Sequence, residues 1–269
     1  MRRREFGATG LEVSVLGQGT WRMEKDPVAN AVEALRQGLE LGMTHIDTAE
    51  AYGDGQVEEL VASALVGRRD RAFLTSKVLP QNATHDGTLR ACEASLKRLK
   101  TDRLDLYLLH WAGSYPLEGT LRAFDKLQRD GKIRAYGVSN FDVAELEQAL
   151  AIVGEGKLAC NQALYHLGER TVESQILPWC QAHRVALVGY SPFGSGHFPD
   201  PAVGGGKVLA QLAKAKGCTP RQMALAFLTR QSGTFSLPKA SNAAHAEENA
   251  KADALTLTDE EVTLIDQAF

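Results

Sequence analysis

The sequence contains little cysteine and none of the spacings that cysteine-based sites use. Its 269 residues include four cysteines, and none of them forms a Cys-x-x-Cys pair. This pattern excludes the common zinc-ligand spacings and provides no disulfide framework. Cys160 lies in an apolar, strand-like segment and Cys92 on an apolar helical stripe, so we interpret both as packed core residues. The chain also contains Cys180 and Cys218. Reduced thiols are typical of the cytoplasm, where we expect this protein.

Strong net charge and long apolar runs are also absent. Lys and Arg total 30 against 33 Asp and Glu, a formal net charge of -3, so the broad cationic field that attracts nucleic acid is missing. No apolar run approaches the roughly 20 residues that a membrane-spanning helix needs. The basic residues Arg2 to Arg4 are not followed by the apolar stretch of a signal peptide. We therefore expect no nucleic-acid partner, no membrane partner and no export.

Two glycine-rich phosphate-binding signatures are incomplete. Gly17-Gln18-Gly19 continues with Thr20-Trp21-Arg22, so the Gly-x-Gly-x-x-Gly of the open dinucleotide-binding sheet is missing. The run Gly204 to Gly206 precedes Lys207 without the Walker spacing, and we interpret it as a flexible loop. These absences favour a closed barrel over an open, doubly wound sheet.

What is present is a repeated alternation of short apolar segments with longer segments of helical period. Such alternation predicts a parallel sheet covered by helices. We expect strands over Val15–Gly19, His45–Thr48, Ala72–Val78, Leu104–His110, Ile133–Ser139, Ala159–Ala163, Val185–Ser191 and Thr234–Pro238. Eight strands in a chain of this length predict a single (β/α)8 barrel, or TIM barrel, over residues 1–269.

Local signals mark the ends of this barrel and its helices. A Gly-Ala-Thr-Gly turn at Gly7–Gly10 predicts a short N-terminal β-hairpin. Thr219-Pro220 reads as a helix N-cap followed by its first residue, and Thr258 with Glu261 as a capping box that opens a C-terminal helix. Apolar stripes at helical spacing include Val28/Val32/Leu35/Leu39, Leu89/Cys92/Leu96/Leu99 and Leu117/Leu121/Phe124/Leu127.

Four ionisable residues fall at or just after the ends of predicted strands. Asp47, Lys77 and His110 end three of them, and Tyr52 follows in the loop after Asp47. Reactive groups of α/β barrels gather at the carboxyl ends of the strands, so we expect these four side chains on one rim.

Carbonyl reduction is the chemistry that suits this set. It needs a hydride from a cofactor and a proton for the developing alkoxide. Tyr52 is the candidate proton donor, and we expect the Lys77 ammonium to lower its pKa from about 10. Asp47 would hold the charge of Lys77, and His110 would donate a hydrogen bond to the substrate oxygen.

Each of the four has a structural alternative when taken alone. Asp47 and Lys77 would also fit a structural ion pair, Tyr52 an amphipathic surface position, and His110 a core histidine. A metal site built from His45 and Asp47 lacks a third ligand, so we predict no bound metal. An aldolase-type barrel would use Lys77 as a Schiff-base amine instead.

The residues around these positions resemble the aldo-keto reductase superfamily from Gly17 to the final helix. Ile46-Asp47-Thr48-Ala49 with Tyr52 is similar to the family's Asp-Thr-Ala-x-x-Tyr signature, and Ser76-Lys77-Val78 and Leu106–Trp111 are similar to its lysine and histidine segments. The resemblance implies the catalytic tetrad Asp47, Tyr52, Lys77 and His110, with Tyr52 as the proton donor. It also implies NADPH as the cofactor.

The same resemblance implies a set of cofactor contacts. Ser139, Asn140 and Gln162 would bind the nicotinamide carboxamide, Tyr190 would stack on the nicotinamide ring, and Lys239 would bind the 2′-phosphate. Two positions depart from the family pattern, Ala240 and His245, so NADH use stays open. The remaining expected contacts are Gly19, Thr20, Ser191, Pro192, Gly194, Ser241, Asn242, Glu248 and Asn249.

Trp21 and Trp111 follow two predicted strands, and we expect them to wall the substrate pocket, with core packing as the alternative. The loop Ala112–Tyr115 is short, which predicts an open pocket for small carbonyl compounds. The segments around His110 and Lys239 resemble bacterial members that reduce methylglyoxal-like 2-oxoaldehydes, and we expect a monomer. The alternative function is a regulatory module that binds NADPH with little turnover.

Overall fold

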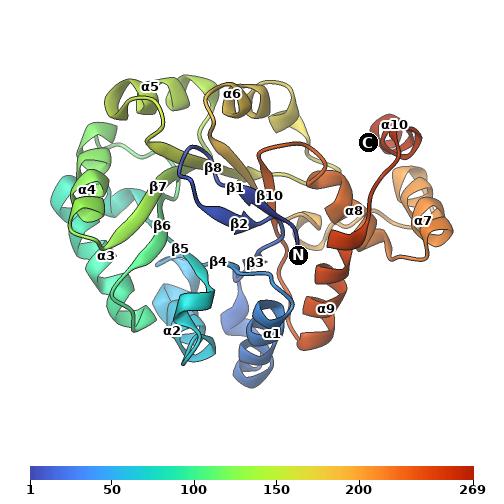
Figure 1. The fold of residues 1–269 in the computed structure, drawn as a ribbon, viewed down its shortest axis with the longest axis horizontal. Coiled ribbons are helices and arrows are strands. Elements are labelled where there is room, and N and C mark those ends of the chain that lie inside the picture. Colours follow the sequence, from blue (N-terminus) through green and yellow to red (C-terminus); the bar gives the residue numbers. More distant parts are fainter.

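The computed structural model describes residues 1–269. Eight parallel strands form a ring with helices around its outside (Figure 1). The strands pair in chain order from β3 to β10, and isolated parallel bridges from Leu16 to Ser236 and from Gly19 to Lys239 join the two ends of the sheet. The predicted barrel is confirmed. Its strands are β3 (Gln18–Gly19), β4 (His45–Asp47), β5 (Phe73–Val78), β6 (Leu104–Leu109), β7 (Ile133–Ser139), β8 (Leu158–Leu164), β9 (Ala186–Tyr190) and β10 (Thr234–Leu237).

Seven of these strands lie within one residue of their predicted ends, whereas β3 is shorter than the expected Val15–Gly19. Regular pairing with β4 starts only at Gln18. The preceding segment closes the barrel seam instead. A Cβ at Gly17 would lie 2.7 Å from Leu237 Cδ2, so glycine permits the close approach that this closure requires.

The helices follow the strands around the barrel, as the alternation predicts. Thr219 is the N-cap of α8 and a capping box opens α10 at Thr258, as predicted, and Thr219 also forms a capping box with Gln222. The helices are α1 (Val28–Glu40), α2 (Gln56–Ala64), α3 (His85–Leu99), α4 (Leu117–Arg129), α5 (Val143–Val153), α6 (Ile176–Ala182), α7 (Gly204–Lys216), α8 (Pro220–Leu228), α9 (Ala243–Lys251) and α10 (Asp259–Ala268). Short 3-10 turns η1 (Met23–Lys25) and η2 (Tyr52–Gly55) lie in the loops after β3 and β4.

The predicted apolar stripes pack against the barrel, with one exception. Val28 is 63% exposed, while Leu35 and Leu39 of the same stripe are buried. Val28 is the first residue of α1, and Pro27 precedes it as the N-cap. Cys92 and Cys160 are buried, as expected.

The prediction of a flexible loop at Gly204–Gly206 is wrong, because these residues form the first turn of α7. Glycine has poor helix propensity, but tertiary packing overrides it here. A Cβ at Gly205 would lie 2.6 Å from the carbonyl oxygen of Ala268, and a Cβ at Gly206 would lie 2.0 Å from that of Asp200. Only glycine leaves room for these backbone approaches.

The predicted N-terminal hairpin consists of β1 (Arg3–Glu5) and β2 (Glu12–Ser14), which pair antiparallel. It lies across one end of the ring (Figure 1). The buried Phe6 ring lies 5.2 Å from that of Phe73 and 5.0 Å from that of Phe235, centroid to centroid. Because both partners lie near the starts of their strands, the hairpin closes the amino end of the barrel and leaves the carboxyl end open for a site.

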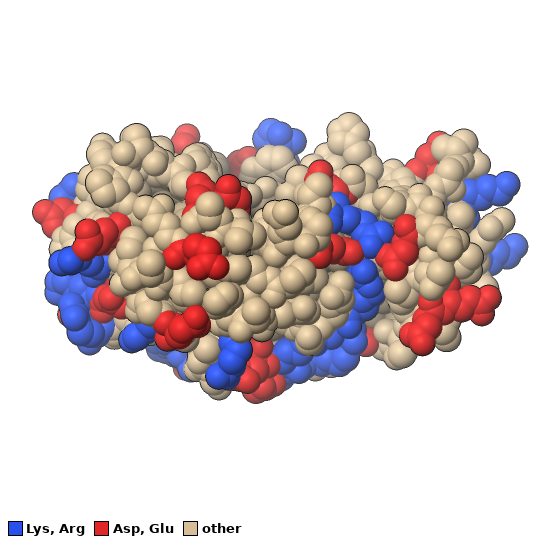
Figure 2. Space-filling model, turned by 90° about the horizontal axis from the view of Figure 1, so that it is seen from above, with Lys and Arg blue, Asp and Glu red and all other residues tan.

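The surface carries acidic and basic side chains interspersed on the face shown in Figure 2, in keeping with the net charge of -3. None of the helices combines the length and the apolar character that crossing a bilayer requires.

Candidate active site

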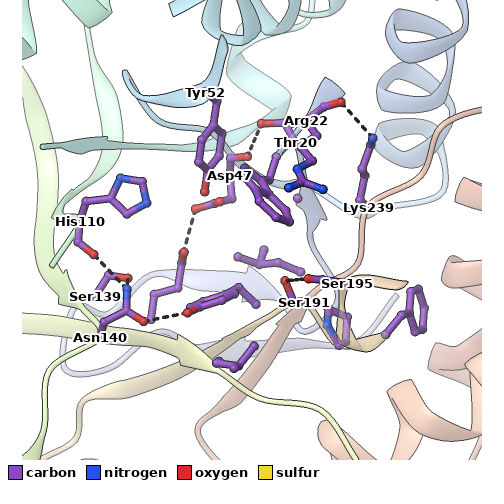
Figure 3. Close-up of a pocket in the computed structure, with 18 of the residues that line it drawn as sticks. Thr20, Arg22, Asp47, Tyr52, His110, Ser139, Asn140, Ser191, Ser195 and Lys239 are labelled. Atoms are coloured by element: carbon purple, nitrogen blue, oxygen red, sulfur yellow. Dashed lines mark hydrogen bonds between the residues drawn. The ribbon is translucent and has the colours of Figure 1, made fainter. Parts of the chain in front are cut away.

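A cavity of about 670 Å³ opens at the carboxyl ends of the strands. Parts of the chain far apart in sequence converge on it, because each strand ends at the same rim (Figure 3). The cavity is lined by Gly19, Thr20, Trp21, Arg22, Asp47, Tyr52, His110, Trp111, Ser139, Asn140, Gln162, Leu164, Tyr190, Ser191, Pro192, Phe193, Ser195, Gly196, Leu237 and Lys239.

Lys77 lies fully buried beneath the cavity and is the hub of the predicted catalytic group. Its ammonium donates to Asp47 Oδ2 at 2.7 Å, to the Thr48 carbonyl oxygen at 2.9 Å and to Tyr52 Oη at 3.1 Å. Although burial lowers the pKa of Lys77, the attraction of Asp47 and Tyr52 outweighs it and leaves this pKa raised. Lys77 therefore stays an ammonium, which disfavours the Schiff-base alternative.

The number of donors on this ammonium determines which partner donates in its hydrogen bond with Tyr52. An ammonium has three donors and no acceptor, and the three bonds use all of them. Tyr52 Oη therefore accepts from Lys77 and keeps its own hydrogen free to donate elsewhere. Tyr52 lines the cavity, so a substrate oxygen there can take this hydrogen.

The sequence led us to expect that Lys77 lowers the pKa of Tyr52 below about 10, and the structure corrects this expectation. Burial raises the pKa of Tyr52, and the opposing attraction of Lys77 is smaller. The hydroxyl is thus protonated at neutral pH. This is the form that a proton donor requires.

Asp47 is held from two sides besides Lys77. Gln162 Nε2 donates to Asp47 Oδ1 at 2.8 Å, and Thr20 Oγ1 donates to the Asp47 carbonyl oxygen at 2.8 Å. Both carboxylate oxygens are therefore occupied, so Asp47 is placed to hold Lys77 rather than to contact a substrate.

His110 faces Tyr52 across the cavity, with the two ring centroids 5.7 Å apart. Burial, with the charge of Lys77, lowers the pKa of His110 to about 3, so the imidazole is neutral. Its Nδ1 is buried and has no hydrogen-bond partner. A neutral imidazole can offer one N–H to a carbonyl oxygen without supplying a charge.

The residues expected at the nicotinamide form one connected group. Asn140 Nδ2 donates to the His110 carbonyl oxygen at 3.1 Å and to Ser139 Oγ at 3.1 Å, and Tyr190 Oη donates to Asn140 Oδ1 at 2.9 Å (Figure 3). Asn140 has a positive φ of 61°, a conformation that asparagine tolerates better than most residues. The Tyr190 ring and the polar groups of Ser139 and Gln162 thus border one part of the cavity.

A second part of the cavity is bordered by the loop after β9. Ser195 Oγ donates to Ser191 Oγ at 2.9 Å, and Pro192 lies between them in the chain. Lys239 approaches from the opposite side of this region (Figure 3).

Seven of the expected cofactor residues lie outside the cavity lining, and their roles stay predictions. Several have structural roles in the chain itself: Ala240 is buried against Ala34 and Ala246, and Glu248 Oε1 accepts from Thr219 Oγ1 at 2.7 Å. The seven are Gly194, Ala240, Ser241, Asn242, His245, Glu248 and Asn249.

Trp21 and Trp111 line the cavity, as predicted, and are 44% and 43% exposed. The guanidinium carbon of Arg22 lies 4.2 Å from the centroid of the Trp21 ring. Core packing, the alternative for both tryptophans, does not fit this exposure.

Sequence reasoning missed Arg22, Leu164, Phe193, Ser195, Gly196 and Leu237. Each lies within a few residues of a predicted site residue, so extending the site along the strand-end loops would have found them. It also missed the Thr48 carbonyl, because a backbone acceptor leaves no mark in the residue type.

No group of three or more His, Cys, Asp or Glu side chains is arranged to hold a metal ion. His45, the residue considered as a ligand with Asp47, is buried, and its Nε2 lies 3.0 Å from Thr75 Oγ1. Its ring packs edge-on against Phe6 and Phe73.

The fold and the site together define the class of this protein: it is an α/β barrel with an Asp-Tyr-Lys-His group at its carboxyl end. The profile described as the aldo/keto reductase family matches residues 15–269. The chain belongs to the aldo/keto reductase family and is an NAD(P)H-dependent oxidoreductase.

Relatives and solved structures agree with this assignment. Methylglyoxal reductase YeaE of Escherichia coli (strain K12) is 42% identical over 96% of this chain and 92% of its own length. Glyoxal reductase of Bacillus subtilis (strain 168) is 33% identical over 96% of this chain and 89% of its own. The crystal structure of an aldo/keto reductase from Klebsiella pneumoniae in complex with NADP and acetate is 41% identical, with a TM-score of 0.92 over 99% of this chain and 95% of that one.

Proposed function

We propose that this protein reduces small reactive carbonyl compounds, with 2-oxoaldehydes as the preferred class, using NADPH and Tyr52 as the proton donor. The observation that carries the proposal is the set of three hydrogen bonds from Lys77, which leaves the hydrogen of Tyr52 free to face the cavity. The names of the methylglyoxal and glyoxal reductases among the relatives support the substrate class.

The residues of the cavity fit a nicotinamide nucleotide. Gln162 lines the cavity, and the hydrogen bonds of the chain engage its amide nitrogen and leave its oxygen as an acceptor for a carboxamide. Tyr190 offers an aromatic face to a planar ring, and Ser191, Ser195 and Lys239 offer polar and cationic groups to phosphates.

Bound NADPH would supply the hydride that adds to the carbonyl carbon. As that bond forms, negative charge develops on the carbonyl oxygen, and Tyr52 transfers its proton to this oxygen to give the alcohol. Lys77 stabilises the phenolate that remains, and Asp47 holds Lys77 in place. The neutral His110 orients the carbonyl oxygen toward Tyr52 through one N–H.

Trp21 and Trp111 would confine the carbonyl compound at the mouth of the cavity. Their rings provide apolar contact area with few rotatable bonds. Every residue in this scheme comes from one chain, so the scheme requires no second subunit.

Steady-state reduction of methylglyoxal and a simple aromatic aldehyde, with NADPH or NADH, tests this function. We expect turnover of both substrates and a higher kcat/KM with NADPH. Lys239→Ala should raise the KM for NADPH and leave that for NADH unchanged, because only NADPH carries the 2′-phosphate. Tight NADPH binding without turnover of either substrate would support the regulatory-module alternative instead.

A further inference from the structure

The side chain proposed to bind the 2′-phosphate is already paired within the chain. Lys239 Nζ lies 2.8 Å from Asp26 Oδ2 and donates to the carbonyl oxygen of Arg22 at 3.2 Å. Figure 3 shows the Lys239 ammonium directed toward Arg22 and away from Ser191 and Ser195. Asp26 and Lys239 belong to opposite ends of the sheet, to the loops after β3 and β10, and barrel closure brings them together.

The backbone of Asp26 is anchored in this position. Asp26 is the C-cap of η1, its N–H donates to the carbonyl oxygen of Met23 at 3.1 Å, and its backbone is extended before Pro27. Asp26 Oδ2 is buried, and no group of the chain other than the Lys239 ammonium, 2.8 Å away, is paired with it. Lys239 is therefore the cation that compensates its charge.

The backbone of Lys239 is fixed as well, since it forms a parallel bridge with Gly19 and its predecessor Pro238 accepts from the Gly19 N–H at 3.1 Å. Only the side chain of Lys239 can reorient. Its side chain is 31% exposed, whereas that of Asp26 is 17% exposed. Lys239 lines the cavity and Asp26 does not. A ligand in the cavity therefore contacts the ammonium, and the carboxylate of Asp26 lies beyond it.

We propose that Asp26 is a specificity-determining residue that weakens the preference of this enzyme for NADPH over NADH. This inference rests on the proposed role of Lys239. A 2′-phosphate either draws the ammonium away from Asp26, which leaves a carboxylate uncompensated, or shares it, which places two anions beside one cation. The ribose 2′-hydroxyl of NADH is uncharged, so it neither draws the ammonium away from Asp26 nor adds a second anion.

The size of the effect follows from the partial exposure of the pair. Solvent-exposed ion pairs are weak, and this one is partly screened. Replacing the carboxylate by the isosteric amide in Asp26→Asn should therefore lower the Kd for NADPH by about twofold to fivefold and leave that for NADH unchanged.

Titration of NADPH and of NADH into the enzyme, followed by the fluorescence of the cavity tryptophans, measures both constants. Asp70→Asn is the matched control. Asp70 is also ion-paired, to Arg103 at 2.6 Å, but it precedes β5 at the amino end of the barrel. Asp70→Asn therefore changes the net charge by the same amount as Asp26→Asn and leaves the cavity unaltered. We expect this control to leave both constants unchanged.

The combination with Lys239→Ala separates the two proposals. If Lys239→Ala weakens the binding of NADPH and of NADH equally, the proposed role of Lys239 itself is wrong. If Lys239→Ala weakens the binding of NADPH alone, but Asp26→Asn leaves the affinity for NADPH unchanged or lowers it, Asp26 only positions the lysine and the inference is overturned. The expected result is a gain for Asp26→Asn that disappears in the Lys239→Ala background. Asp26→Ser provides a second removal of the charge if the amide variant folds poorly.

Discussion

At the residue scale, the chemistry depends on which atom donates in each hydrogen bond around Lys77. The ammonium has no lone pair to offer, so Tyr52 can only accept from it. Burial raises the pKa of Tyr52, so its hydroxyl keeps the proton that the proposed mechanism transfers to a substrate oxygen. In the same proposal the neutral His110 would add a hydrogen bond without competing for that proton.

Tyr52→Phe removes the proposed proton donor and should lower kcat by roughly 10²-fold to 10⁴-fold, the range for general acid catalysis. The Kd for NADPH should stay unchanged, because the ring remains in place. Tyr107→Phe is the matched control, since Tyr107 is buried on β6 and its hydroxyl has no hydrogen-bond partner. Single-turnover reduction of methylglyoxal measures the step. Near-normal turnover of the Tyr52 variant would show that another group donates the proton.

At the element scale, the barrel carries helices whose starts are set in two different ways. Thr219 and Thr258 open their helices through local capping boxes, which need only residues three positions apart. The start of α7 depends on backbone beyond its own first turn, because Gly205 lies against the carbonyl oxygen of Ala268 and Gly206 against that of Asp200. Glycine in a helix thus lowers stability at a position with room for a Cβ and is required at a position without it.

A pair of glycine-to-alanine substitutions tests this difference. Gly206→Ala places a Cβ 2.0 Å from the Asp200 carbonyl oxygen and should destabilise the protein despite the better helix propensity of alanine. Gly119→Ala in α4 meets only the His85 nitrogen at 3.4 Å, an ordinary contact, and should raise the free energy of unfolding by roughly 0.5–1 kcal/mol. Urea unfolding of both variants measures the signs. A stabilised Gly206 variant would mean that the Asp200 segment moves aside easily.

At the scale of the whole molecule, closing the amino end of the barrel buries a titratable ring. His45 lies among Phe6 and Phe73, and burial lowers its pKa to about 4. The unfolded chain takes up a proton near pH 6.5, while the folded barrel resists it. This part of the stability is therefore complete above pH 6.5 and is lost as the pH falls toward 4.

The free energy of unfolding should consequently decrease from pH 6.5 to pH 4, with His45 contributing roughly 3 kcal/mol of that decrease. His45→Gln keeps a polar group near Thr75 and does not titrate, so its curve should be flatter over this interval. His85→Asn replaces an exposed histidine at the start of α3 and serves as the control. Denaturant unfolding at a series of pH values gives the slopes. An unchanged slope in His45→Gln would assign the acid sensitivity to other groups.

The sequence by itself determined the features that depend on neighbours along the chain. Hydrophobic periodicity located eight strands, and strand ends located Asp47, Lys77 and His110, because all parallel strands of a barrel end at one rim. Capping boxes needed only local residues. The resemblance of the Asp47 to Tyr52 segment then indicated the family, and the family match over residues 15–269 confirms it.

Only the tertiary structure decided the features that depend on burial and on contacts across the barrel. The pKa of Tyr52 is raised because burial outweighs Lys77. The first turn of α7 requires glycine because a Cβ at Gly205 or Gly206 would clash with the carbonyl oxygen of Ala268 or Asp200. The pair of Asp26 with Lys239 joins residues from the two ends of the sheet. Residue types and spacing carry no such distances, since these exist only once the ring has closed.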